Sequence, residues 1–268
     1  MIIDFHTHAF PDAVAAKAIP TLEKLGNITA HTKGTVDSLL QSMDGAGIEK
    51  SVICSIATRP EQFEAILKWS NEVQSSRIIP LPSIHPQDPN CVEHVYRVQE
   101  QGFAGIKMHP YYQDYFLADE TLFPFYEAIS DCQMLLVAHC GYDIGFPRSR
   151  CADPAQILKL ITAFPNLRFI ATHFGGWQLW DEVEELLIGR EIYMEISFAL
   201  KYLPHEQIRR MLQNHPREYL LFGSDSPWDG QRECLQNLAE LSLDPELFHA
   251  ITKENAQKLL TEVSHNQG

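Results

Sequence analysis

The sequence lacks the features of a membrane-bound or secreted protein. None of its apolar runs reaches 18 residues, the length that a membrane-spanning helix requires. The first residues contain no basic segment followed by an apolar run, so no secretory signal is predicted. The six cysteines form no Cys-x-x-Cys pair, and their wide spacing is typical of free thiols in a reducing compartment. We therefore expect a soluble, cytoplasmic protein.

Basic residues are also scarce. Lys and Arg total 21 against 35 Asp and Glu, which gives a formal net charge of −14. Nucleic acids and anionic membranes would repel such a chain, so neither is an expected partner. A small-molecule substrate remains the expected partner. A homodimer is possible, but no apolar surface pattern in the sequence decides it.

Low-complexity linkers and abrupt changes of composition are absent, which predicts a single domain spanning residues 1–268. Two short motifs are missing as well. No Gly-x-Gly-x-x-Gly turn follows the first apolar run, which counts against a dinucleotide-binding open sheet. No Gly-x-Ser-x-Gly turn occurs, which counts against a serine hydrolase.

The chain instead alternates apolar, β-branched runs with longer amphipathic segments. Continuous apolar runs are typical of strands buried on both faces of a parallel sheet. Eight such units of about 34 residues favour a closed α/β (β/α)8 TIM barrel over an open doubly wound sheet. The predicted strands cover residues 1–6, 51–56, 78–84, 105–108, 134–138, 168–172, 192–197 and 219–223. The predicted helices cover residues 36–46, 61–75, 91–101, 120–132, 154–163, 179–188, 204–214, 231–241 and 245–260.

Two segments depart from this regular plan. Pro80 and Pro82 weaken the third predicted strand, because proline cannot donate a ladder hydrogen bond. Residues 9–34 are long for a loop between a strand and a helix, and the spacing of apolar residues such as Val14 and Leu22 suggests a short helix. We expect this insertion after the first strand to lie over the barrel mouth as a lid.

Polar side chains gather at the ends of the predicted strands. The carboxyl ends of barrel strands meet at one mouth, where the active sites of such proteins lie. A His-x-His pair closes the first strand, and alternation along a strand should put His6 and His8 on one face. The other strand ends carry His85, Lys107, His109, His139, His173, Ser197 and Asp225.

Imidazole and carboxylate groups that converge on one point can bind a divalent metal ion. Three imidazoles and one carboxylate suit Zn²⁺, with Mn²⁺, Fe²⁺ or Co²⁺ as alternatives. Structural roles stay open at this point. A histidine at a strand end can be a hydrogen-bonded, partly buried ring, and Asp225 can be a turn or helix-capping residue.

Four motifs resemble a known family. Residues 4–8 read DFHTH, residues 139–141 HCG, residues 172–176 THFGG and residues 223–227 GSDSP. Together and in this order they are similar to the amidohydrolase superfamily. The greatest similarity is to the branch that contains aminocarboxymuconate-semialdehyde decarboxylase and many metal-dependent hydrolases. The likeness spans the whole chain, but the motifs say little about the substrate.

The resemblance implies a metal centre that holds one divalent ion. Its ligands would be His6, His8, His139 and Asp225. Asp225 would also be a catalytic residue that transfers protons, and His173 would be a second catalytic residue next to the metal.

Lys107 leaves two alternatives, because many binuclear members of the superfamily use a carboxylated lysine on the fourth strand as a bridging ligand. The sequence around it is closer to the mononuclear branch, so we expect Lys107 and His109 to face the substrate. Arg148 could bind the charged group of an anionic substrate. Trp177 could contact an apolar face of the substrate. The alternatives are a solvated Arg148 and a Trp177 that packs against loops.

These residues predict a hydrolase that cleaves an amide, ester or lactone bond of a small, anionic substrate with a metal-activated water. The alternative is a metal-dependent, non-oxidative decarboxylase of an unsaturated or aromatic carboxylic acid, which would use the same ligands. A non-catalytic metal-binding protein is a third hypothesis. It predicts that part of the ligand set is missing, whereas the whole set is present.

Overall fold

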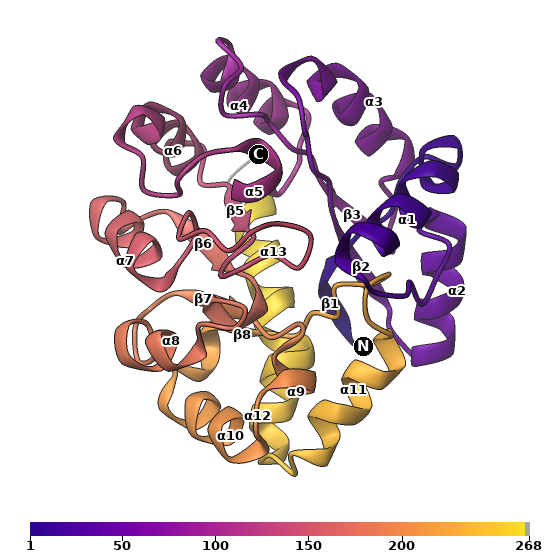
Figure 1. Cartoon of the computed structure of the whole chain (residues 1–268), viewed down its shortest axis with the longest axis vertical. Coiled ribbons are helices and arrows are strands. Elements are labelled where there is room, and N and C mark those ends of the chain that lie inside the picture. The colour runs from indigo at the N-terminus through magenta and orange to yellow at the C-terminus, as the bar shows by residue number, and fades with distance from the viewer. Residues whose placement is uncertain (266–268) are drawn as a thin grey trace.

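Eight short strands alternate with helices along the chain, as the sequence predicts (Figure 1). The computed structural model describes residues 1–265, so residues 266–268 of the predicted domain lie outside the described part. Within residues 1–265 the strands are β1 (Ile3–Thr7), β2 (Lys50–Cys54), β3 (Ile78–Leu81), β4 (Gly105–Met108), β5 (Leu135–Ala138), β6 (Arg168–Ala171), β7 (Tyr193–Glu195) and β8 (Leu220–Leu221). The longer helices are α1 (Asp12–Gly26), α2 (Val36–Ala46), α3 (Phe63–Val73), α4 (Cys91–Glu100), α6 (Phe123–Asp131), α7 (Pro154–Ala163), α8 (Trp180–Leu186), α10 (His205–Asn214), α11 (Gln231–Glu240) and α13 (Asn255–His265). Short helices are α5 (Pro110–Gln113), α9 (Ala199–Tyr202) and α12 (Pro245–His249).

The paired strands are parallel, and they form the predicted (β/α)8 barrel from two ladders, β1–β2–β3 and β4 to β8. Pro82 explains why the regular strand pairing stops between β3 and β4, where the two ladders meet. Its carbonyl accepts a hydrogen bond from the backbone nitrogen of Lys107 (2.9 Å), but it has no N–H to donate in return. At the seam between β8 and β1, the backbone nitrogen of Phe5 donates to the carbonyl of Phe222 (2.8 Å).

Helix α13 covers the amino-terminal end of the barrel. In Figure 1 this yellow helix crosses the middle of the ring of strands. Its Ala256, Leu259 and Val263 pack against side chains of the barrel strands, among them Ile3 and Phe5 near the start of β1. The opposite end, where the strands finish, is therefore the open mouth.

The predicted helix over residues 245–260 is helical throughout, and a π-helical turn, Ala250–Glu254, joins α12 to α13 within it. The backbone nitrogen of Phe222 donates to the carbonyl of Ile251 in that turn (3.0 Å). The side-chain amide of Asn255 donates to the carbonyl of Leu220 (2.8 Å). These bonds attach the π-helical turn to β8, and helical periodicity gives no sign of such a tertiary contact.

The insertion after β1 contains the helix that the apolar spacing predicts, although α1 is 15 residues long rather than short. Ala15 and Ile19 are buried against the protein, whereas Val14 and Leu22 line a cavity at the barrel mouth. The lid position is therefore confirmed. Among the helices of residues 1–265, none combines the length and the hydropathy that crossing a membrane requires.

Candidate metal centre

A β-bulge in β1 brings the His-x-His pair into the cavity. Between Asp4 and Thr7, β1 advances three residues while the facing β2 advances two. Phe5 packs in the barrel cluster beneath α13, yet the next residue, His6, lines the cavity together with His8. Simple alternation would put Phe5 and His6 on opposite faces, so the bulge is what aims the histidine.

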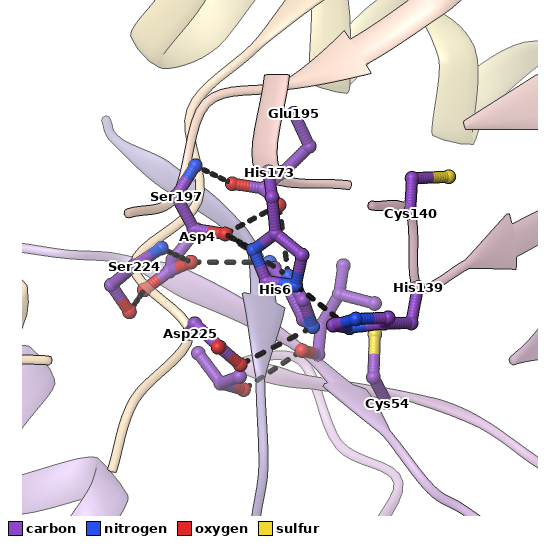
Figure 2. Close-up of polar contacts among 12 residues, drawn as sticks. Asp4, His6, Cys54, His139, Cys140, His173, Glu195, Ser197, Ser224 and Asp225 are labelled. Atoms are coloured by element: carbon purple, nitrogen blue, oxygen red, sulfur yellow. Dashed lines mark hydrogen bonds and ion pairs between the residues drawn. The ribbon is translucent and has the colours of Figure 1, made fainter. Parts of the chain in front are cut away.

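Three side chains converge at the cavity floor (Figure 2 shows two of them, His6 and Asp225). Oδ1 of Asp225 lies 2.9 Å from Nε2 of His8 and 3.4 Å from Nε2 of His6. One ligand atom from each residue lies within 4.8 Å of the other two, and all three residues are buried. Among the described residues, Asp225 Oδ1 has no hydrogen-bond partner.

The tautomers of both histidines follow from what their other nitrogens contact. Nδ1 of His6 lies 2.8 Å from a carboxylate oxygen of Glu195, and Nδ1 of His8 lies 2.7 Å from the carbonyl oxygen of Cys54. Oxygens of these kinds accept, so each Nδ1 carries the proton and each Nε2 presents a lone pair. Two nitrogen lone pairs and a carboxylate oxygen thus face one another. This arrangement fits a divalent cation, which would accept electron density from all three.

Burial keeps the imidazole of His6 in the neutral form that binds metals. It lowers the pKa of His6 well below 6.5, and the positive charge of Lys107 lowers this pKa further. Burial raises the pKa of Asp225, while its contact with His8 acts in the opposite direction. Burial also lowers the pKa values of His109, His139 and His173 well below 6.5.

Glu195 is a residue of the centre that the sequence analysis missed. It is fully buried on β7, where it accepts the proton of His6 Nδ1 and hydrogen bonds from the backbone nitrogen and hydroxyl of Ser197. Burial raises the pKa of Glu195, while the hydrogen bonds from Ser197 act in the opposite direction. Gly223 makes room for it, because a Cβ there would overlap the Glu195 carboxylate. A charged residue inside an apolar strand was the available signal.

Asp4, the first residue of the DFHTH motif, has a structural role. Its buried carboxylate accepts hydrogen bonds from the hydroxyl of Ser224 (2.6 Å) and the side chain of Gln231 (2.8 Å). The backbone nitrogen of His6 donates to it as well (3.2 Å). Burial raises the pKa of Asp4 to about 6, against the effect of these bonds. Asp4 therefore joins β1 to the loop after β8, next to Asp225.

His139 lies beside the three converging residues, in a neighbouring group. Its Nε2 donates to the carbonyl of Tyr142 (3.0 Å), its Nδ1 lies 3.0 Å from Nε2 of His173, and its ring stacks on His109 with centroids 4.2 Å apart. Ligand atoms of His109, His139 and Asp143 form their own cluster. The structure thus brings three of the four predicted ligands together, and a ligand role for His139 stays a prediction.

His173 and Lys107 both reach the centre from strand ends. Nδ1 of His173 lies 2.9 Å from the hydroxyl of Ser197, which connects it to Glu195. The buried ammonium of Lys107 lies 3.1 Å from Nε2 of His6. An ammonium can only donate, which supports a proton-free Nε2 on His6.

Unusual backbone conformations occur at two of these residues. His173 and Asp225 have φ angles of 56° and 63°, in the left-handed region that residues other than glycine seldom adopt. Such conformations cost about 1–3 kcal/mol each and persist where the surrounding structure enforces them. Strain of this kind concentrates at active sites and ligand clamps.

Of three predicted substrate residues, His109, Trp177 and Arg148, two line the cavity and one does not. His109 and Trp177 line the cavity, which has a volume of about 710 Å³. Arg148 is not among the lining residues; it donates to the side chain of Gln178 (2.9 Å) and lies over the ring of Tyr142, 4.8 Å from its centroid. Arg148 is exposed, as the alternative of a solvated arginine expects, and a substrate role for it stays a prediction.

The family follows from comparison of the chain with known proteins. Residues 3–261 match the family model described as Amidohydrolase, and the chain belongs to this family. Its superfamily consists of enzymes that use a divalent metal, among them hydrolases and decarboxylases. No curated protein matches the sequence.

Solved structures with the same fold include an uncharacterized protein, a proposed hydrolase and a decarboxylase. An uncharacterized TIM-barrel protein from Bordetella bronchiseptica is 18% identical, with a TM-score of 0.82 over 98% of this chain and 99% of that one. A protein from Pseudomonas putida, proposed to be a 2-pyrone-4,6-dicarboxylic acid hydrolase, is 14% identical, with a TM-score of 0.68 over 97% of each chain. The 5-carboxyvanillate decarboxylase of Novosphingobium aromaticivorans, complexed with manganese, is 13% identical, with a TM-score of 0.73 over 97% of this chain and 96% of that one. At these identities the likeness establishes the fold alone.

Proposed function

We propose that the protein is a metal-dependent hydrolase that cleaves an amide, ester or lactone bond of a small, anionic substrate. One observation carries this proposal. Nε2 of His6, Nε2 of His8 and Oδ1 of Asp225 lie within 4.8 Å of one another at the floor of a large cavity. Membership of the amidohydrolase family supports the same chemistry.

The residues that would hold the ion are His6, His8 and Asp225, with His139 as the fourth predicted ligand. Zn²⁺ suits nitrogen and oxygen ligands of this kind, and Mn²⁺, Fe²⁺ and Co²⁺ are alternatives. When bound, a divalent ion acidifies a water molecule and polarises a carbonyl or carboxyl group of the substrate. We expect one ion per chain.

The chain supplies the proton transfers and the substrate contacts. Asp225 has an oxygen without a hydrogen-bond partner in the cavity, so it can accept a proton from the attacking water and later return it to the leaving group. His173 can stabilise negative charge that develops on the substrate. The ammonium of Lys107, which also lines the cavity, would contact an anionic group of the substrate. His109 and Trp177 lie in the wall of the same cavity.

The second candidate is a non-oxidative decarboxylase of an unsaturated or aromatic acid. Two observations favour it: a decarboxylase with bound manganese shares the fold, and aromatic side chains such as Trp177 wall the cavity. In this reaction Asp225 or His173 would deliver a proton to the carbon that loses carbon dioxide. Both reactions need the same centre, so the products decide between them.

The test is a product assay on the full chain loaded in turn with Zn²⁺, Mn²⁺, Fe²⁺ and Co²⁺. Small lactones, esters and amides that carry a carboxylate are one panel, and aromatic and muconate-type acids are the other. New titratable acid or amine without carbon dioxide supports the hydrolase. Release of carbon dioxide supports the decarboxylase and overturns the hydrolase.

Variants connect the activity to the centre. Asp225→Asn should lower turnover by about 10²–10⁴-fold, the range that positioned proton transfer contributes. His205→Ala, at an exposed histidine on α10, is the matched control and should leave turnover unchanged. Full turnover in metal-loaded Asp225→Asn would refute the proton-transfer role. A folded, metal-loaded protein that turns over neither panel would favour the non-catalytic alternative.

A further inference from the structure

The cavity above the metal centre changes in character from floor to mouth. Its floor is polar, with imidazoles, Lys107 and Asp225 at the strand ends. Aromatic rings such as Tyr112, Trp177 and Trp228 form its walls. Side chains from α1, most of them aliphatic but with Lys17 and Thr21 among them, form its mouth together with Ile144 from the loop after β5. A ligand that matches this order has a polar group at one end and an apolar body.

Helix α1 contributes one continuous apolar row to the mouth. Val14, Ala18 and Leu22 are four residues apart, so they lie on one face of the helix, and all three line the cavity. A different face, with Ala15 and Ile19, is buried against the protein. The row facing the cavity is therefore additional to the face that fixes α1 to the barrel.

The loop after β5 faces this row across the mouth. Ile144 lines the cavity, and a Cβ added to Gly26 at the end of α1 would lie 2.8 Å from its Cδ1. Ile144 and Val14 remain 40% and 47% exposed, although both are large apolar side chains. A ligand with an apolar part would remove these surfaces from water, which is a favourable process.

The size of the cavity indicates a similar ligand. A volume of about 710 Å³ lies in the upper part of the range of about 300–1,000 Å³ that pockets for drug-sized molecules span. A single small acid at the floor would leave the apolar mouth in contact with water.

We propose that the substrate is an amphipathic carboxylate whose apolar part extends from the metal centre along the row Val14, Ala18 and Leu22. The apolar part is a chain of several carbons or a further ring, and α1 is the wall that selects for it. The orientation rests on the proposed function, because the reacting group must lie at the floor.

Straight-chain carboxylates are the probe for this proposal. Acetate, butanoate, hexanoate and octanoate are titrated into the full chain, with and without added Zn²⁺, by calorimetry and by the fluorescence of the tryptophans that line the cavity. A buried methylene contributes about 0.8 kcal/mol, so affinity should rise about fourfold per added carbon until the mouth is filled. An affinity that does not change with chain length would overturn the proposal.

Paired variants on α1 locate the apolar part. Leu22→Ser should weaken octanoate binding at least fivefold and leave acetate binding unchanged, because only the longer chain reaches the row. Ala16→Ser is the control on the same helix: Ala16 is exposed and does not line the cavity. Equal weakening by both variants would mean a general loosening of α1 and would also overturn the proposal.

The outcomes separate this inference from the proposed function. Binding of the carboxylate series requires neither turnover nor a defined reaction. A protein that binds metal and turns over substrate, yet shows no dependence on chain length, refutes only the role of α1. A protein that shows the chain-length dependence without any turnover refutes only the proposed reaction.

Discussion

The carboxylate of Glu195 determines which nitrogen of His6 faces the cavity. It accepts the proton of Nδ1 at 2.8 Å and leaves Nε2 free for a cation. Glu195 also accepts from the hydroxyl of Ser197, whose oxygen lies 2.9 Å from Nδ1 of His173. One buried acid thus orients two histidines of the centre without lining the cavity itself.

Replacing Glu195 should therefore weaken metal binding. Loss of a partner that orients a metal-binding histidine typically costs 10–100-fold in affinity, and we expect this loss for Glu195→Ala. Glu195→Gln keeps an oxygen that can accept the Nδ1 proton, so its loss should be smaller. Titration of Zn²⁺ into each folded variant measures both effects. Wild-type affinity in Glu195→Ala would show that His6 needs no such partner.

The sequence predicts the side chains that face the cavity, but it does not predict the buried side chain, Glu195, that orients His6 by a hydrogen bond. His6, His8 and Asp225 follow apolar runs at strand ends, which is a local pattern. Glu195 contacts His6 across 189 positions of sequence, and no local pattern reports that pairing. The neighbouring position of His139 depends on its bond to the Tyr142 carbonyl, a loop geometry that residue spacing does not specify.

At the scale of elements, the eight strands were predictable because parallel strands buried on both faces are continuous apolar runs. The irregular features were not predictable. The bulge in β1 depends on register against β2, and the π-helical turn between α12 and α13 depends on hydrogen bonds to β8. Both adjust regular elements to fit neighbours that are distant in the sequence.

The role of α13 as the cover of the barrel's amino-terminal end gives a stability prediction. Leu259 is 1% exposed within the barrel cluster, so Leu259→Ala should lower the free energy of unfolding by about 2–5 kcal/mol. Gln257→Ala, at an exposed site on the same helix, should change it by no more than about 0.5 kcal/mol. Chemical denaturation of both variants measures the difference. Equal stabilities would contradict the packing role of α13.

At the scale of the whole molecule, buried histidines should make the fold sensitive to acid. Burial lowers the pKa of six of the described histidines below 6.5, so below that pH the unfolded chain binds more protons than the folded protein. Burial raises the pKa of three carboxyl groups, which has the opposite effect in the same range. The histidines are His6, His85, His109, His139, His173 and His215, and the carboxyl groups are those of Asp4, Glu195 and Asp225.

Because the histidines outnumber the carboxyl groups, the metal-free protein should lose stability between pH 6.5 and pH 5. We expect the melting temperature to fall across this interval by several degrees. Thermal unfolding followed by circular dichroism at both pH values, in a chelator and at constant ionic strength, is the measurement. A melting temperature that stays constant or rises toward pH 5 would contradict the neutral state of these rings.

The metal content of the full chain tests the central claim most directly. After incubation with Zn²⁺ or Mn²⁺ and removal of the excess, elemental analysis should find about one ion per chain in the wild-type protein and in His205→Ala. It should find almost none in a folded double variant of His8→Ala and Asp225→Ala. An absence of metal in the wild-type protein, or an undiminished content in the double variant, would contradict the convergence of His6, His8 and Asp225 on one ion. About two ions per chain would refute the single-ion centre and indicate either a modified Lys107 or a second ion at His109, His139 and Asp143.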